Sequence, residues 1–249
     1  MAQTKALVIN CDMGESYGPW IMGADEQLMP FIDWANIACG QHASDPETMQ
    51  ATIALAQRYD VAIGAHPGYP DRVGFGRRPF PLHGAALQAS LWHQIGALAG
   101  QCQAVGLQLN HIKPHGALYN KMMQDEGTLR CVLQAVAAFD AQLPMVVQAQ
   151  AQAANAALQD IASEYSVRLW FEAFADRAYL PNGQLSPRNH PDAVYQEPAR
   201  IVQQARSLMQ HGQLLSSAGE ALSLAADTLC FHGDNPACLA ALQQLRHTH

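Results

Sequence analysis

The chain has 249 residues, a length that one large α/β barrel can occupy without a second domain. Its hydrophobic fraction of 49% and charged fraction of 14% are typical of a well-buried globular protein and exclude a disordered chain. The formal charge of −7 disfavours a nucleic-acid partner, because no basic surplus is present to neutralise phosphates. We therefore expect a single domain over residues 1–249 that acts on a small molecule.

The cysteines and the N-terminal segment favour the cytoplasm. Six cysteines are scattered without Cys-x-x-Cys pairs, mostly inside apolar stretches, and this pattern is typical of buried thiols in a reducing compartment. The apolar run at residues 6–9 is too short for a signal peptide, and no apolar segment reaches the ~20 residues that span a bilayer. We expect a cytoplasmic protein with no membrane partner.

Short β-rich runs alternate with longer helical patterns, which is the signature of βαβ units around a parallel sheet. The expected strands are nearly continuous apolar runs, as strands covered on both faces should be. They lie at residues 6–11, 34–39, 61–65, 109–113, 145–149, 167–173 and 228–232. This alternation predicts an α/β barrel, with an open doubly wound sheet as the alternative.

The segments between the expected strands carry helix signals. Asp45 suits a helix N-cap and Pro46 the first helical position, and an apolar stripe at helical spacing runs from Leu87 to Leu98. Two connections, 68–81 and 180–198, are too long for plain linkers and are rich in Gly, Pro or Asn. Long loops of this kind are usually functional, so we expect both to border a site.

Ionisable and amide side chains collect where the expected strands end. Because parallel strands in a barrel end on one face, these clusters should converge on a common pocket. Side chains two residues apart share a face of a strand, so within each cluster one parity should point together. The residues concerned are Asn10, Asp12, Glu15, His42, His66, Lys113, His115, Glu172, Asp176, Arg177, His232 and Asp234.

Simpler structural roles compete with the functional ones. Asp45 and Asp234 both fit helix capping, and a single histidine at a strand end is more often a hydrogen-bonded structural residue than a catalyst. Five of the eleven histidines at convergent strand ends favour a site. Arg77 and Arg78 suit a solvated loop pair beside a flap-like Gly74-Phe75-Gly76, and the cysteines suit packing rather than nucleophilic attack.

The collected acids, bases and single lysine suffice for hydrolysis at a carbonyl. The sequence contains neither a Gly-x-Ser-x-Gly elbow nor a Walker A loop, which disfavours a serine hydrolase and a P-loop ATPase. Asp12, His42 and His66 match the ligand types of zinc or manganese sites. A divalent metal is therefore possible, although spacing across strands cannot test it.

The motif series resembles that of the 5-oxoprolinase A-subunit family, the LamB/YcsF group, from about residue 7 to 245. The matching segments are Asn10-Cys11-Asp12-Met13-Gly14-Glu15-Ser16, Ala35-Asn36-Ile37-Ala38-Cys39-Gly40, Ala62-Ile63-Gly64-Ala65-His66-Pro67, Lys113-Pro114-His115-Gly116-Ala117-Leu118-Tyr119-Asn120, Phe174-Ala175-Asp176-Arg177 and His232-Gly233-Asp234. Departures from the family pattern occur at Gln41, at Ser44 and over residues 189–192.

The resemblance implies a distorted seven-stranded barrel of the glycoside hydrolase/deacetylase type. It further implies ATP-dependent opening of 5-oxoproline to L-glutamate, with ATP as cofactor and with two partner subunits of the B and C types. On this hypothesis the catalytic residues are Asp12, His66, Lys113, His115 and Asp234. The base is His66, Asp12 or Asp234, while Lys113 and His115 stabilise the oxyanion.

The remaining polar residues are assigned to substrate binding on the same hypothesis. Arg177 would hold the substrate carboxylate in a two-pronged contact. The others are Asn10, Glu15, His42, Glu172, Asp176 and His232. Two rival functions stay open: a metal-dependent amide or sugar deacetylase built around Asp12, His42 and His66, and a non-catalytic subunit that binds a ligand for a partner.

Overall fold

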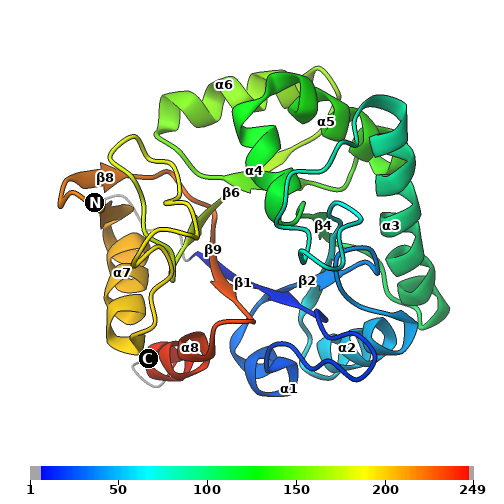
Figure 1. Ribbon diagram of the computed structural model, residues 1–249, viewed down its shortest axis with the longest axis horizontal. Coiled ribbons are helices and arrows are strands. Elements are labelled where there is room, and N and C mark those ends of the chain that lie inside the picture. The colour runs from blue at the N-terminus through cyan, green and yellow to red at the C-terminus, as the bar shows by residue number, and fades with distance from the viewer. Residues whose placement is uncertain (1–6, 247–249) are drawn as a thin grey trace.

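The computed structural model describes residues 7–246. Seven parallel strands close a barrel in the order β1-β2-β3-β4-β5-β6-β9, with the helices arranged around it (Figure 1). The strands are β1 (Val8–Met13), β2 (Trp34–Ala38), β3 (Ala62–His66), β4 (His111–Ile112), β5 (Met145–Gln148), β6 (Leu169–Phe174) and β9 (Thr228–His232). The expected seven-stranded α/β barrel is confirmed, and the open sheet is wrong. Ala6, expected to begin the first strand, lies outside the described residues.

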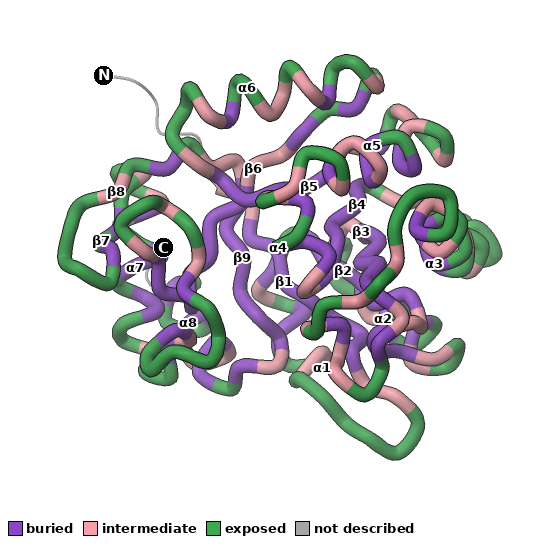
Figure 2. The backbone as a smooth tube through the Cα atoms, turned by 45° about the horizontal axis from the view of Figure 1, so that its top comes forward, coloured by how far each residue is buried: buried purple, intermediate pink, exposed green. Residues whose placement is uncertain are grey.

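Helices cover the outside of the barrel, so the strands are buried on both faces (Figure 2). They are α1 (Asp25–Leu28), the 3-10 helix η1 (Met29–Phe31), α2 (Pro46–Arg58), α3 (Gly84–Ala104), α4 (Gly116–Gln124), α5 (Glu126–Asp140), α6 (Gln152–Ser163), α7 (Pro198–His211) and α8 (Pro236–Arg246). The stripe from Leu87 to Leu98 is buried against the strands, as expected. Within residues 7–246, no helix combines the length and the apolar character needed to cross a membrane.

Two helix starts separate capping from chemistry. Asp45 caps α2 as expected, since its carboxylate accepts the Thr48 amide at 2.9 Å. At α8 the cap is Asn235, whose Oδ1 accepts the Ala237 amide at 3.1 Å. Asp234 instead pairs with Arg77, so the capping alternative for Asp234 is wrong.

Two features depart from the sequence expectation. The fourth strand is only two residues long because its pairing with β5 reduces to Ile112 opposite Met145, although the amide of Lys113 still donates to Ala65 O at 2.8 Å. A short antiparallel hairpin, β7 (Gln213–Leu215) with β8 (Ala221–Ser223), lies outside the barrel between α7 and β9. Its strands bury a single side chain, Leu214, so the alternating pattern that betrays a strand is almost absent.

Strand register places the polar residues side by side. Asp12 on β1 lies opposite Asn36 on β2 and opposite His232 on β9. Gly64 on β3 lies opposite His111, and a Cβ at this glycine would overlap the His111 ring. Only glycine therefore lets that imidazole cross into the barrel interior.

Candidate functional site

A cavity of about 730 Å³ opens at the carboxyl ends of the barrel strands. The two long loops form much of its wall, through Arg77 from one and residues 181–188 from the other, as expected for functional loops. The basic side chains at its surface are Arg77, Lys113, Arg177 and Arg188. Among the described residues that line it, Asp12 alone carries a carboxylate, so the cavity suits an anionic ligand despite the negative net charge of the chain.

Lys113 is the centre of a buried charge network on the cavity floor. Its Nζ lies 2.8 Å from Asp12 Oδ1 and 3.0 Å from Glu172 Oε2. The same Nζ donates to Asn10 Oδ1 at 3.2 Å and lies 3.1 Å from the sulfur of Cys230. One ammonium therefore links strands β1, β6 and β9 through side chains predicted to share a site.

The charges in this network set the protonation of its members. Burial alone lowers the pKa of Lys113, but the Asp12 and Glu172 carboxylates outweigh it and hold the pKa well above its usual value. Burial alone raises the pKa of Asp12, but His66 and Lys113 hold it well below its usual value. Burial raises the pKa of the Cys230 thiol, which agrees with packing rather than nucleophilic attack. The floor is therefore an ammonium facing carboxylates.

Asn36 orders this floor although it was absent from the predicted site. Its Nδ2 donates to Asn10 Oδ1 and to Asp12 Oδ1, both at 2.8 Å, and its Oδ1 faces Nε2 of His111 at 2.7 Å. These bonds show that Asn10 and Asp12 share a face, as the two-residue period predicted. The available signal was an amide inside an otherwise apolar buried strand, which must find partners.

Three histidines and Glu15 form a second buried cluster. Nδ1 of His66 donates to the Lys113 carbonyl at 2.7 Å, and Nε2 of His115 donates to the Phe75 carbonyl at 2.9 Å. Nε2 of His66 then lies 2.9 Å from Nδ1 of His115. The Gly74–Gly76 stretch is thus a hydrogen-bonded wall of this cluster, and Gly76 adopts a φ of 62°, with no room for a Cβ beside the histidines.

Glu15 and His42 complete the cluster. Glu15 Oε1 lies 3.5 Å from His42 Nε2 and 3.5 Å from His115 Nδ1. The His42 ring stacks on the His115 ring with the two planes 1° apart. Burial and the nearby Asp12 raise the pKa of Glu15 well above its usual value, while burial and His66 lower the pKa of His42. The cluster thus holds few charges in its present form.

The predicted metal trio is not the set that the structure groups. Asp12 Oδ2 lies 3.4 Å from His66 Nε2. The potential ligand atoms that gather within 4.8 Å of one another nevertheless belong to Glu15, His42, His66 and His115, while Asp12 groups with Cys230 and His232. Glu15 and His115 therefore replace Asp12 beside the two predicted histidines.

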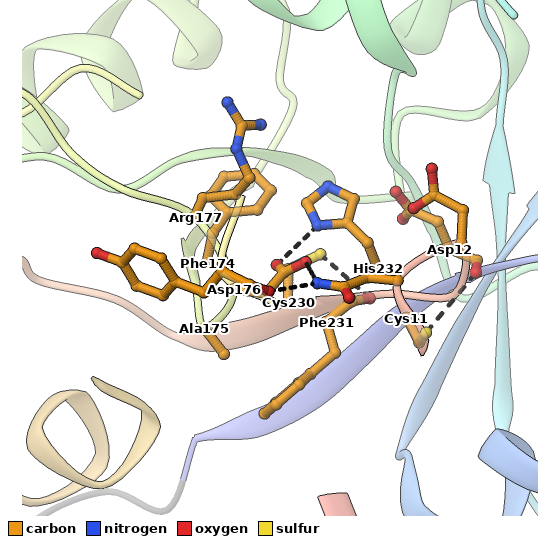
Figure 3. A network of polar contacts seen from close by, with 12 residues as sticks. Cys11, Asp12, Phe174, Ala175, Asp176, Arg177, Cys230, Phe231 and His232 are labelled. Carbon is orange, nitrogen blue, oxygen red and sulfur yellow. Dashed lines mark hydrogen bonds and ion pairs between the residues drawn. The ribbon is translucent and has the colours of Figure 1, made fainter. Parts of the chain in front are cut away.

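A third group pairs His232 with Asp176 (Figure 3). Nδ1 of His232 lies 2.8 Å from Asp176 Oδ1, and Asn235 donates to the other carboxylate oxygen at 3.0 Å. Burial alone raises the pKa of Asp176, but His232 lowers it to about 2. Asp176 therefore stays ionised and fixes the imidazole with its second nitrogen free, while the ring stacks on Phe174 at the cavity.

Arginines at the cavity mouth have divided roles. Arg77 lies 2.7 Å from Asp234 and lines the cavity, so its expected role as a solvated loop residue is wrong. Arg78 does pair at the surface, with Asp71. Arg177 donates to the carbonyls of Ser186 at 2.7 Å and Ala193 at 3.1 Å. Two of its donors thus hold the 180–198 loop in place and are not available for the expected two-pronged carboxylate contact.

Arg188 was not predicted from the sequence. It lies on the loop that Arg177 anchors and lines the same cavity. Its only sequence signal was its position in a loop too long for a connector. Arg188 thus adds a guanidinium to the mouth.

The predicted convergence of the strand-end clusters is present in the structure: Asp12, His66, Lys113 and His232 all line one cavity. Glu172 and Asn10 lie beneath it in the Lys113 network, and Asp234 stands at its edge through Arg77. An ammonium, a carboxylate-oriented imidazole and ionised carboxylates around one pocket can position water and stabilise negative charge on a carbonyl oxygen.

Comparisons with known proteins identify the family. The model of the LamB/YcsF family matches residues 7–249. A protein of Pseudomonas putida, named as a 5-oxoprolinase A subunit, is 53% identical over 97% of this chain and 93% of its own length. A Vibrio cholerae protein, also named as the A subunit of 5-oxoprolinase, is 48% identical over 97% of both chains.

The fold comparison agrees. The crystal structure of the lactam utilization protein from Thermus thermophilus superposes with a TM-score of 0.88 at 38% identity, over 98% of this chain and 96% of that one. The family match, the identity to named relatives and the shared barrel all cover almost the whole chain. The chain therefore belongs to the LamB/YcsF family.

Proposed function

We propose that this chain opens the ring of 5-oxoproline by hydrolysis, giving L-glutamate, as one component of an ATP-dependent, multi-subunit 5-oxoprolinase. The observation that carries the proposal is a cavity with basic walls and an acid–base floor, in a chain about half identical to proteins named as 5-oxoprolinase A subunits. The naming of these relatives as one subunit among several further supports an assembly, and we assign the other subunits to the B and C types.

The geometry suggests how the residues divide the work. Water adds to the lactam carbonyl, the C–N bond breaks, and the released nitrogen takes a proton. His232, held by Asp176 with one nitrogen free, is better placed as the base than Asp12, whose low pKa makes it a weak one. Lys113 retains the predicted role of stabilising negative charge.

Substrate binding follows from the mouth. The carboxylate of 5-oxoproline is an anion, and Arg188 offers a guanidinium at the cavity wall. Arg77 adds positive charge beside it, although Asp234 neutralises much of that charge. We therefore transfer the predicted carboxylate contact from Arg177 to Arg188.

ATP supplies the free energy for attack on an unreactive amide. The sequence has no Walker A loop, so we assign nucleotide use to the assembled enzyme rather than to this chain alone. The reaction places the protein in the cytoplasm, where ATP and reduced thiols coexist; all six cysteines are free and five are buried.

An exposed apolar loop beside α1 is the proposed contact for a partner subunit. Trp20 is 68% exposed and Ile21 89%, in a stretch that is exposed from residue 18 to 23 (Figure 2). Val73, 92% exposed, follows Arg72, whose guanidinium covers the ring of Tyr17 at 3.7 Å. Adjacent large apolar side chains near a site mouth are typical of interaction surfaces. Trp20→Ser should weaken co-purification with the partners and leave the fold unchanged, whereas Trp92→Ser on α3 serves as the control.

The activity test uses the chain with and without its two co-expressed partners. 5-Oxoproline and ATP are supplied, and glutamate and ADP are followed. Glutamate should form in the complete assembly, and Asp12→Asn should lower its rate by roughly 10²–10⁴-fold, because that carboxylate orients both Lys113 and Asn36. Full activity of the assembly without this chain would show that the chain does not catalyse.

The second candidate function is a metal-dependent amide or sugar deacetylase, favoured by the buried Glu15–histidine cluster. Release of acetate from N-acetyl sugars by the isolated chain, without conversion of 5-oxoproline by the assembly, would replace the first proposal with this one.

A further inference from the structure

Backbone carbonyls fix the protonation pattern of two histidines in the cluster. A carbonyl oxygen can only accept, so Nδ1 of His66 carries the hydrogen donated to Lys113 O, and Nε2 of His115 carries the hydrogen donated to Phe75 O. In neutral rings the other nitrogen, Nε2 of His66 and Nδ1 of His115, then presents a lone pair. These are the atoms that lie 2.9 Å apart.

Two lone pairs facing each other at this distance repel unless a positive centre lies beside them. That centre is either a proton shared by the two rings or a metal cation. Orientation of each ring by a carbonyl on its far nitrogen is the arrangement that metal-binding histidines use. The pair therefore has the form of two prepared ligands.

The neighbouring atoms decide between the two possibilities. Among the described residues, Glu15 Oε1 and both ring nitrogens of His42 are buried without a hydrogen-bond partner. A proton shared between His66 and His115 would satisfy neither of them. A cation would satisfy Glu15 Oε1, which lies 3.5 Å from His115 Nδ1, and could take His42 Nε2 as well.

The distances also fit an ion. Ligand atoms at ~2.1 Å from one centre lie roughly 3.0 Å apart in an octahedron and roughly 3.4 Å apart in a tetrahedron. The measured separations are 2.9 Å between the two histidines and 3.5 Å from His115 to Glu15. His42 stacks parallel to His115, so both rings cannot aim their in-plane lone pairs at one point until His42 turns.

We infer that Glu15, His66 and His115 bind a divalent first-row transition metal such as Zn²⁺ or Co²⁺, with His42 as a fourth ligand after its ring turns. Imidazole-rich ligand sets favour these ions over Mg²⁺ and Ca²⁺. Three protein ligands with a further position filled by His42 or by a small molecule are characteristic of a site that can also take part in catalysis. The inference concerns binding alone and holds whichever substrate the cavity accepts.

The test measures metal binding by the whole chain after chelation and dialysis. Wild-type protein should rebind Zn²⁺ stoichiometrically by elemental analysis, and Co²⁺ should give visible absorption bands typical of nitrogen and oxygen ligands. Mg²⁺ should not compete. Glu15→Gln, His66→Gln and His115→Gln should each weaken binding by roughly 10–100-fold or more. The control His93→Gln, an exposed histidine on α3, should bind as the wild type does.

Folding is controlled by near-UV circular dichroism of each variant. A measurement on wild-type protein covers the case in which a variant unfolds: nitrogen-15 NMR of the histidine rings should show Nε2 of His66 and Nδ1 of His115 shifting when Zn²⁺ is added. Wild-type affinity in all three ligand variants would overturn the inference. So would ring spectra that do not respond to the metal and instead report a proton shared between the two histidines.

Discussion

Lys113→Met removes a buried ammonium from between two carboxylates while keeping an unbranched side chain of similar length. Asp12 Oδ1 at 2.8 Å and Glu172 Oε2 at 3.0 Å then face each other without a counter-charge. Neither carboxylate can turn to water, because both are almost completely buried. We therefore expect a large loss of stability as well as of activity.

The magnitude follows from breaking a buried ion network by removing one partner. Such changes cost about 3–5 kcal/mol, mainly because the remaining charge stays buried and unpaired. Domains are commonly stable by about 5–15 kcal/mol, so the variant should fold but unfold at a clearly lower urea concentration. Part of the cost should disappear as Asp12 or Glu172 takes up a proton, which raises the pKa of the freed carboxyl.

A double-mutant cycle separates the charge effect from lost packing. The wild type, Lys113→Met, Glu172→Gln and the double variant are unfolded in urea at pH 7 and followed by fluorescence. Because the double variant leaves one carboxylate unpaired instead of two, its loss should be smaller than the sum of the single losses by roughly 1–3 kcal/mol. Additive losses within about 0.5 kcal/mol, or a Lys113→Met variant as stable as the wild type, would refute the reasoning.

Three further changes test other parts of the structure. The Asp176 pKa of about 2 is depressed below its usual value of 3.8, so the carboxylate contributes stability above pH ~4 that is lost as pH falls toward 2. Asp176→Asn should remove roughly 2 kcal/mol of that dependence, and urea midpoints of both proteins between pH 5 and 2 should converge; parallel curves would contradict this. Gly64→Ala should destabilise the chain by about 1–3 kcal/mol through overlap with the imidazole on β4, measured by urea unfolding, and an unchanged midpoint would show that the ring moves freely. Arg188→Gln should raise KM for 5-oxoproline in the assembled enzyme more than it lowers kcat, whereas Arg78→Gln should change neither; equal effects would discard the carboxylate assignment.

The fold could be predicted because its signals are local. Each buried strand is a short apolar run, and each helix start carries its own chemistry, as Asp45 does at α2. The convergence of Asp12, His66 and Lys113 followed from one rule of parallel barrels, that strand carboxyl ends share a face. The β7–β8 hairpin was missed because it buries almost nothing and so leaves no pattern.

The details of the site depend on contacts between strands that no local signal specifies. Asn36 looks like one amide in an apolar run, and only the register with β1 shows that it ties Asp12 to Asn10. Arg177 and Arg188 are indistinguishable in sequence, yet one is held by two loop carbonyls and the other lines the cavity without them. The choice of Glu15 over Asp12 beside the histidines depends on loop geometry after the first strand.

Lys113 connects the two buried clusters through different atoms, and this separation gives a last prediction. Its ammonium holds Asp12, whereas its main-chain carbonyl fixes Nδ1 of His66. Replacing the side chain by methionine keeps the carbonyl, and the adjacent amide bond to Ala65 O keeps that stretch of main chain in place. Folded Lys113→Met should therefore retain the Co²⁺ absorption of the wild type while Glu15→Gln loses it, although both lose stability or activity. Loss of Co²⁺ binding in folded Lys113→Met would mean that the ammonium network, rather than the main chain, positions the histidine.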